Sequence, residues 1–179
     1  MIDGKGDPNG EEFQGAVEAL YSLSYTIKFW TKKHEAPEGF VDFGVSCLEA
    51  LWWVDGDDLG AMNMNAPRET WRWTAMILQP PFVQKSLLEE AKAEASKKKL
   101  NPSLESVRFE SFEEGPSVQI MHIGPYSEEM RTIDKIVAFM DQELLASNGK
   151  HHEIYLGDPR RSDPQKLKTI LRHPVKNQL

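Results

Sequence analysis

The sequence has a single cysteine, Cys47, among its 179 residues. One cysteine cannot form a disulfide within the chain, so the protein fits a reducing compartment such as the cytoplasm. The sequence also lacks any run of about eighteen apolar residues, the length that a membrane-spanning helix needs, so we expect no membrane protein. No apolar stretch follows a basic start at the N-terminus, which argues against a secretory signal.

Positive charge is scarce as well. Lysine and arginine number 21 against 28 aspartates and glutamates, and the formal net charge is -7. A nucleic-acid-binding surface needs a basic stripe that displaces counterions. Basic residues gather only in residues 97–99, where they suit the negative end of a helix dipole, and in residues 160–176. We therefore expect no nucleic-acid partner.

Several common catalytic signatures are absent. The sequence contains neither a glycine-rich phosphate loop nor a Gly-x-Ser-x-Gly nucleophile turn. His151 and His152 are adjacent, and adjacent residues of a strand point to opposite faces, so with His122 they make a poor metal site. Cys47 has no obvious histidine partner and is expected to be a buried, inert thiol. We expect neither a metal nor a cofactor.

Tryptophan is the residue in excess. Five are present, and four of them are Trp52, Trp53, Trp71 and Trp73. Hydrophobic residues make up 40% of the chain, which is typical of a globular protein and enough for a core in one domain. Because large aromatic side chains form either a core or a binding surface, these four residues need a structural assignment.

Hydrophobic periodicity predicts the secondary structure. The predicted helices cover residues 11–33, 82–100 and 127–148. The predicted strands cover residues 40–54, 70–78, 104–113, 118–123, 152–156 and 169–175. Asn9 with Glu12 predicts a capping box at the start of the first helix. Residues 55–58 and 59–68 are expected to form a turn and a loop, and residues 114–116 a hairpin turn between two strands.

The two halves of the chain resemble each other. Residues 1–4 precede the first helix as residues 121–124 precede the third, and Glu49 and Glu153 are each followed by aromatic residues. This pattern predicts an α+β fold with two β-α-β-β units. A single domain would span residues 1–179, with repeat one at about 1–80, a linking helix at 82–100 and repeat two at about 104–176. We expect a pseudo-two-fold antiparallel sheet, helices on one face and a ligand groove on the other. Met1 would then fall within the first strand.

Particular segments carry a resemblance to a known family. Residues 121–126 (MHIGPY), 151–161 (HHEIYLGDPRR) and 166–172 (KLKTILR) resemble the GyrI-like small-molecule-binding family. Residues 71–80 (WRWTAMILQP) and 1–9 resemble its stand-alone branch. The resemblance covers nearly the whole chain and implies the double β-α-β-β fold.

The resemblance also implies function. Many members of the family bind flat, hydrophobic, often cationic compounds, and multidrug sensors add a DNA-binding helix-turn-helix, which we do not expect here. Some stand-alone members hydrolyse cyclopropane-bearing genotoxic natural products by opening the strained ring. Another member inhibits DNA gyrase, a role that no residue here specifically supports.

Glu153 is the first candidate for chemistry. In an alternating strand, His151, Glu153 and Tyr155 share a face. A poorly solvated carboxylate there would attract a ligand cation or act as a base toward water, and the family places its ligand-contacting glutamate at this motif. The alternative is an exposed strand glutamate. Tyr155 and Tyr126 would add a stacking face and a hydroxyl, either as catalytic and ligand-binding residues or as edge packing.

Trp53, Trp71 and Trp73 are candidate walls of the ligand site. Trp71 and Trp73 share one strand face, so the alternative is that both pack in the core beneath the helices. Trp52 points away from Trp53. We prefer Trp53 because it shares a face with Glu49, the counterpart of Glu153 in the repeat and a possible second carboxylate.

Three functions follow. The first is a binding module for planar hydrophobic, often cationic small molecules, which protects by sequestration. The second is a cofactor-independent hydrolase, in which Glu153 activates water and Tyr155 or Tyr126 hydrogen-bonds a carbonyl. These two share a pocket and differ in turnover. The third is a protein-interaction module, such as one that binds gyrase. The sequence names neither the ligand nor the oligomeric state.

Overall fold

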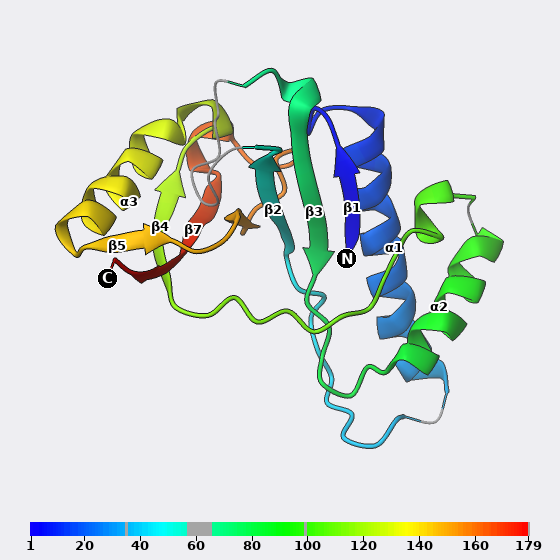
Figure 1. The fold of residues 1–179 in the computed structure, drawn as a ribbon. Helices are drawn as coiled ribbons and strands as arrows, with labels where there is room; N and C mark the ends of the chain where they lie inside the picture. The colour runs from blue at the N-terminus through cyan, green and yellow to red at the C-terminus, as the bar shows by residue number, and fades with distance from the viewer. Residues whose placement is uncertain (35, 57–65, 99, 179) are drawn as a thin grey trace.

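The computed structural model describes residues 1–34, 36–56, 66–98 and 100–178, and within these seven strands form an antiparallel sheet with three α-helices (Figure 1). The helices are α1 (Glu11–Lys33), α2 (Lys85–Lys98) and α3 (Met130–Gln142). The strands are β1 (Ile2–Lys5), β2 (Leu48–Val54), β3 (Trp71–Ile77), β4 (Ser117–Ile123), β5 (Leu145–Ser147), β6 (His151–Tyr155) and β7 (Lys168–Asn177). No helix among these residues is apolar and long enough to cross a bilayer.

The order of the strands relates the two halves. The path through the sheet is β1-β3-β2-β6-β7-β4, and β5 pairs with β7 outside this path. Each end of the path is the first strand of a unit, β1-α1-β2-β3 or β4-α3-β6-β7, and the second strands β2 and β6 pair at the centre. The predicted α+β fold with an antiparallel sheet is therefore confirmed.

The helices α1 and α3 cover the same face of the sheet. Ala50 of β2 pairs with Glu153 of β6, and Glu153 pairs with Leu171 of β7, so these three side chains share a face. Ala50 packs in the core beneath α1, and Leu171 in a second core with Ile136 of α3. Within the described residues, no helix packs on the other face of the sheet, which we call the open face.

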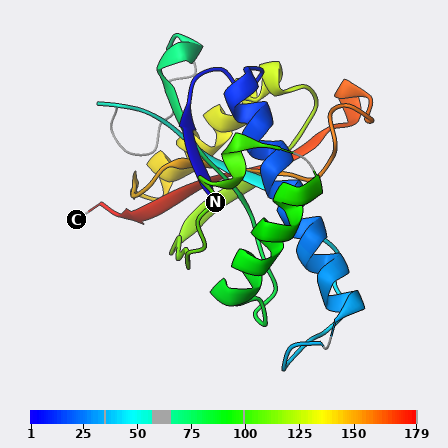
Figure 2. The ribbon, with the colours of Figure 1, turned by 90° about the vertical axis from the view of Figure 1, so that its right-hand side faces the viewer.

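Helix α1 carries α2 on its outer side, and its C-terminal turns project beyond the strands (Figure 2). Its predicted bounds, residues 11–33, are confirmed. The predicted capping box is wrong: the cap is Gly10, the backbone N–H of Asn9 bonds to Oδ1 of Asp7, and Oε1 of Glu12 accepts from the backbone N–H of Lys5. The acidic side chain thus ties the helix to β1 instead of to its own first turn.

The second half departs from the predicted elements in two places. Residues 107–116 form no strand, and β4 pairs with β7 instead of with this segment, so the predicted hairpin is wrong. Figure 1 shows the segment crossing from the side of α2 to the side of β4. The third helix ends at Gln142 instead of residue 148, because Leu144 adopts φ 53° and the chain turns into β5. The predicted loop at residues 59–68 lies mostly outside the described residues.

Candidate functional site

Glu153 lies on the helix-covered face of β6 with both carboxylate oxygens bonded. Nε2 of His151 donates to Oε1 at 3.1 Å, and the hydroxyl of Tyr155 donates to Oε2 at 2.6 Å. The side chain is only 6% exposed. The two donors stabilise negative charge on Glu153 and hold its carboxylate in one orientation. The predicted shared face of His151, Glu153 and Tyr155 is confirmed by these contacts.

A second histidine stands behind the first. Nδ1 of His151 lies 2.7 Å from Nε2 of His173, and both rings are buried. Burial and the neighbouring His151 lower the pKa of His173 to about 3, so His173 is neutral at physiological pH. One of the two rings donates a hydrogen bond to the other across this contact, and the tautomers decide which ring is the donor. The buried chain His173–His151–Glu153 therefore runs from β7 to the carboxylate.

Glu129 supplies a second carboxyl group beside Glu153. It lies at the start of α3 and is 1% exposed. Burial, and next the negative charge of Glu153, raise its pKa to about 9, although a hydrogen bond with Thr169 opposes the shift. Within the described part of the chain, its Oε1 has no hydrogen-bond partner. Burial and the charge of Glu153 thus both favour the protonated form of Glu129.

Tyrosines border the two carboxyl groups. The rings of Tyr126 and Tyr155 meet edge to face with centroids 5.7 Å apart. Burial and the charge of Glu153 raise the pKa of Tyr126 to about 12, so its hydroxyl keeps its proton. Tyr155 also accepts a 3.0 Å hydrogen bond from Nε1 of Trp52, and Tyr21 of α1 accepts one of 3.2 Å from the backbone N–H of Leu48. The carboxyl pair is thus surrounded by hydroxyls and aromatic rings.

The turn between β4 and α3 positions Tyr126 and Glu129. Gly124 adopts φ 137°, a conformation that side chains disfavour, and lets the chain turn sharply. His122 fixes the turn from inside, because its Nε2 lies 3.2 Å from the carbonyl oxygen of Pro125 and its Nδ1 2.9 Å from the hydroxyl of Thr132. His122 is therefore a support for the site.

The structure separates the predicted tryptophans. Trp73 is fully buried against Phe13 in the core, with ring centroids 5.0 Å apart. Trp71 packs edge to face on Trp52 at 5.8 Å. Trp53 lies on the open face, where the ammonium group of Lys150 is 3.3 Å from its ring centroid. Trp52 is joined to the site by its hydrogen bond to Tyr155.

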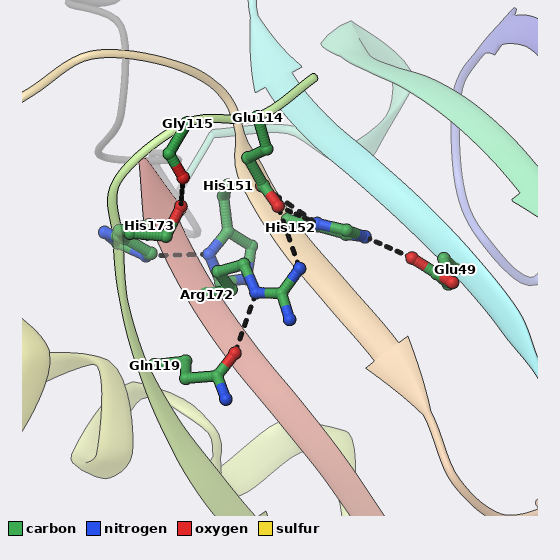
Figure 3. A network of polar contacts seen from close by, with 9 residues as sticks. Glu49, Glu114, Gly115, Gln119, His151, His152, Arg172 and His173 are labelled. Carbon is green, nitrogen blue, oxygen red and sulfur yellow. Dashed lines mark hydrogen bonds and ion pairs between the residues drawn. The ribbon is translucent and has the colours of Figure 1, made fainter. Parts of the chain in front are cut away.

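Glu49 also lies on the open face, because it pairs with Ile154 and not with Glu153. There it accepts a 3.0 Å hydrogen bond from Nε2 of His152, whose Nδ1 bonds to Glu114 at 2.9 Å (Figure 3). Arg172 bonds to the same Glu114 at 2.9 Å. This network fastens residues 107–116 to the sheet and leaves Glu49 unavailable as the partner of Glu153.

The open face carries a polar cavity of about 470 Å³, lined by Trp53, Arg72, Arg108 and Lys150 together with acidic residues. It lies on the opposite side of the sheet from Glu153. The expected groove on the open face is thus separate from the candidate catalytic group, because strand parity places Glu153, Tyr155 and Trp52 between α1 and α3. Within the described residues, no three His, Cys, Asp or Glu side chains are arranged to hold a metal ion.

Sequence reasoning missed Glu129. It follows Tyr126 by three residues at the start of a helix, a spacing that brings both side chains near one end of α3. The Gly-Pro-Tyr motif directly before it was a usable signal. What the spacing alone did not reveal is that β6 passes close enough for Glu153 to raise the pKa of Glu129.

Comparisons with known proteins identify the family of the chain. The GyrI-like small molecule binding domain matches residues 85–176. An uncharacterized conserved protein from Listeria innocua is 46% identical in sequence over 98% of this chain and 85% of its own, with a TM-score of 0.88. The chain therefore belongs to the GyrI-like small-molecule-binding family.

Two further structures from Listeria innocua are described as hydrolases, one of them encoded by lin2189. They are 45% and 44% identical, cover 98% of this chain and 85% of their own, and have TM-scores of 0.84 and 0.85. The EcmrR C-terminal domain shares the fold at 10% identity, with a TM-score of 0.54 over 99% of this chain and 89% of its own. A search of curated proteins finds no match.

Proposed function

We propose that this protein is a hydrolase that opens a strained, cyclopropane-type ring in a planar hydrophobic substrate, with Glu153 as the base and Glu129 as the acid. One observation carries the proposal: the buried carboxylate of Glu153 is held by His151 and Tyr155, and the buried carboxyl group of Glu129 feels its charge, so that burial and Glu153 raise the pKa of Glu129 to about 9. Paired carboxyl groups whose environments separate their protonation states are the usual basis of acid–base catalysis at neutral pH.

The reaction is an addition of water. Glu153 takes a proton from water as the oxygen attacks a ring carbon, and the new C–O bond forms as the strained C–C bond breaks. The released electron pair moves into a conjugated carbonyl group of the substrate. The carbonyl oxygen receives a proton from Glu129, and the proton on Glu153 restores Glu129 afterwards through solvent. The product is the substrate plus one water, and no cofactor takes part.

The tyrosines have supporting roles in this reaction. Tyr126 keeps its proton, because its pKa is raised to about 12, and can donate a hydrogen bond to the carbonyl oxygen as negative charge develops. Tyr155 holds Glu153 through the 2.6 Å hydrogen bond. The rings of Tyr126 and Tyr155 are the flat surfaces beside the carboxyl pair, whereas Trp52 is buried in the core and holds Tyr155 through its indole N–H.

Two features favour turnover over capture alone. The oxygens of Glu153 already accept hydrogen bonds from His151 and Tyr155, so this carboxylate has less need of a ligand cation than a bare one. The structures described as hydrolases are 44% and 45% identical over nearly the whole chain. Capture without turnover uses the same residues and is the outcome to be tested against.

The test follows a cyclopropane-bearing alkylator by mass over time in the presence of the protein. We expect a gain of one water in many equivalents of alkylator per protein. Glu153→Gln and Glu129→Gln should each slow this by at least about a hundredfold. Glu128→Gln is the matched control, because Glu128 is a neighbouring glutamate that pairs with Arg131 at 2.9 Å. Binding without a change in mass would reject the hydrolase, and full turnover by Glu153→Gln would reject the role of Glu153.

A further inference from the structure

The polar cavity on the open face has the size of a small-molecule site. Its volume is about 470 Å³, and sites for small molecules commonly enclose about 300–1,000 Å³. Its walls come from the neighbouring strands β1, β3 and β2, from Arg108 of the segment 107–116, and from Lys150, which immediately precedes β6. Because it lies on the opposite side of the sheet from Glu153, it is separate from the proposed catalytic site.

The carboxylate of Asp3, on the floor of this cavity, is already bonded within the protein. It accepts a 2.6 Å hydrogen bond from the hydroxyl of Thr74 and one of 2.9 Å from Nη2 of Arg108. Burial opposes its charge, but these hydrogen bonds outweigh burial and lower the pKa of Asp3. Asp3 is therefore an ionised group whose charge is matched by Arg108.

The other two acidic side chains that line the cavity also have partners. Asp55 accepts from Nε of Arg72 at 2.9 Å. Oε1 of Glu12 accepts from the backbone N–H of Lys5 at 3.1 Å. The carboxylates of the cavity are thus engaged by the protein itself, which makes them weak attractants for a cationic ligand.

Lys150 is a cation of this cavity that has no such partner. Its ammonium group packs on Trp53, 3.3 Å from the ring centroid, and no carboxylate of the described residues lies within ion-pair distance of it. Burial lowers the pKa of Lys150, and the attraction of Asp3, which the charge of Arg108 opposes, does not compensate for it. The cavity therefore holds a half-buried positive charge that no carboxylate matches.

Arg72 is a second cation beside the same ring. It pairs with Trp53 across β3 and β2, and its guanidinium group faces Asp55 through Nε and Nη2. A carboxylate held in this way occupies two of the five N–H donors of an arginine, so Arg72 retains donors for a second oxyanion. Two cationic side chains thus flank Trp53, Lys150 on the face of its ring and Arg72 on the neighbouring strand.

We propose that this cavity binds a small organic oxyanion, a polar molecule that carries a phosphate or carboxylate group, between Lys150 and Arg72. The anionic group matches the charge of Lys150, and the guanidinium donors of Arg72 bind its oxygens. The cavity is far larger than a single anionic group, so the polar body of the ligand lies in it as well. The site goes beyond the proposed hydrolase and does not depend on it.

The test is isothermal titration calorimetry with glycerol phosphate, glycerate and glycerol, which share a carbon skeleton and differ in the charged group. We expect at least one of the two anions to bind and glycerol not to bind, and the anion that binds identifies the group. Lys150→Gln removes the charge and should weaken binding at least about tenfold. Lys150→Arg keeps the charge and should retain binding. Lys168→Gln is the matched control, because Lys168 is an exposed lysine of β7 that does not line the cavity.

A second measurement needs no variant. In the unaltered protein, the affinity for the anion should fall as salt rises from about 0.05 M to about 0.5 M, because salt screens an interaction between charges. No binding of either anion, equal binding of glycerol, full affinity in Lys150→Gln, an equal loss in Lys168→Gln, or an affinity that does not change with salt would each overturn the site. These titrations contain no alkylator, so their failure leaves the proposed hydrolase standing, and failure of ring opening leaves the anion site standing.

Discussion

The hydroxyl of Tyr155 donates a 2.6 Å hydrogen bond to Oε2 of Glu153 while it accepts a 3.0 Å hydrogen bond from the indole Nε1 of Trp52. The indole can only donate, so the direction of both bonds is determined. This chain of contacts joins β2 to β6 and orients the proposed base from one side, as His151 does from the other.

Replacement of Tyr155 by phenylalanine keeps the ring and removes the donor. We expect kcat/KM for ring opening to fall by about a hundredfold, because Glu153 loses one of the two groups that orient it. Binding of a planar dye should change little, since the stacking surface remains. Steady-state kinetics with parallel dye titration checks this, and an equal loss of dye binding would instead assign Tyr155 to ligand contact.

Replacement of Glu129 by glutamine tests the protonated carboxyl group through stability. Its pKa is raised to about 9 in the folded protein from an ordinary value of 4.5. Between these values, the Glu129 carboxyl group is ionised in the unfolded chain and protonated in the folded protein. Its effect is that the free energy of unfolding is highest below about pH 4.5 and falls as the pH rises toward about 9. The glutamine variant lacks this dependence.

We expect the free energy of urea unfolding of the unaltered protein to fall, relative to that of Glu129→Gln, by about 2–3 kcal/mol between about pH 6 and about pH 8. Comparing the two proteins cancels the other titrating groups. Stability curves that stay parallel with pH would show that Glu129 is ionised in the folded protein. In the unaltered protein, the proposed ring-opening activity should likewise decline near pH 9 as Glu129 loses its proton.

Trp52 and Trp53 form a matched pair that separates the two faces of the sheet. Trp52→Phe removes the donor to Tyr155, and we expect it to raise KM or lower kcat severalfold for a planar substrate. Trp53→Phe changes a ring that lies under Lys150 on the open face, and we expect no effect. Kinetics and dye titration of both variants check this. A larger effect of Trp53→Phe would place the ligand in the open-face cavity.

His152 fastens the segment 107–116 to the sheet through charge. Burial opposes a charge on this ring, but hydrogen bonds to Glu114 and Glu49 outweigh it and raise the pKa of His152. Its contribution to stability is therefore full below its ordinary value of 6.5 and is lost as pH rises through the raised value. Burial opposes a charge on Glu114 as well, but His152 and Arg172 outweigh it and lower the pKa of that carboxyl group, so Glu114 stays ionised in this range.

We expect His152→Gln to lower the free energy of unfolding by roughly 3 kcal/mol at about pH 6, because Glu49 loses the cation that it faces and Glu114 keeps only Arg172. The deficit should shrink at higher pH. Urea unfolding at two pH values measures it, and the exposed Glu113→Gln serves as the control with no expected change. A deficit that does not depend on pH would mean that His152 is neutral in the folded protein.

Local pattern was sufficient for much of the fold. The bounds of α1 follow from an apolar face that repeats at helical spacing between Asn9 and Pro37, and these are signals that a single segment carries. The hairpin predicted at residues 114–116 failed for the opposite reason. A Gly-Pro turn specifies a change of direction but not a pairing partner, and β4 gains more by pairing with β7, more than forty residues later in the chain.

For the site, the sequence by itself determined that His151, Glu153 and Tyr155 share a face, because side chains alternate along a strand. It also identified Tyr126 by its motif. Only the tertiary structure decided which face of the sheet that is, that Trp73 lies in the core and Trp53 on the other side, and that Glu129 meets Glu153. The reason is physical: alternation sets relative direction within one strand, whereas the approach of α3 to β6, and with it the proton on Glu129, depends on how the two halves pack together.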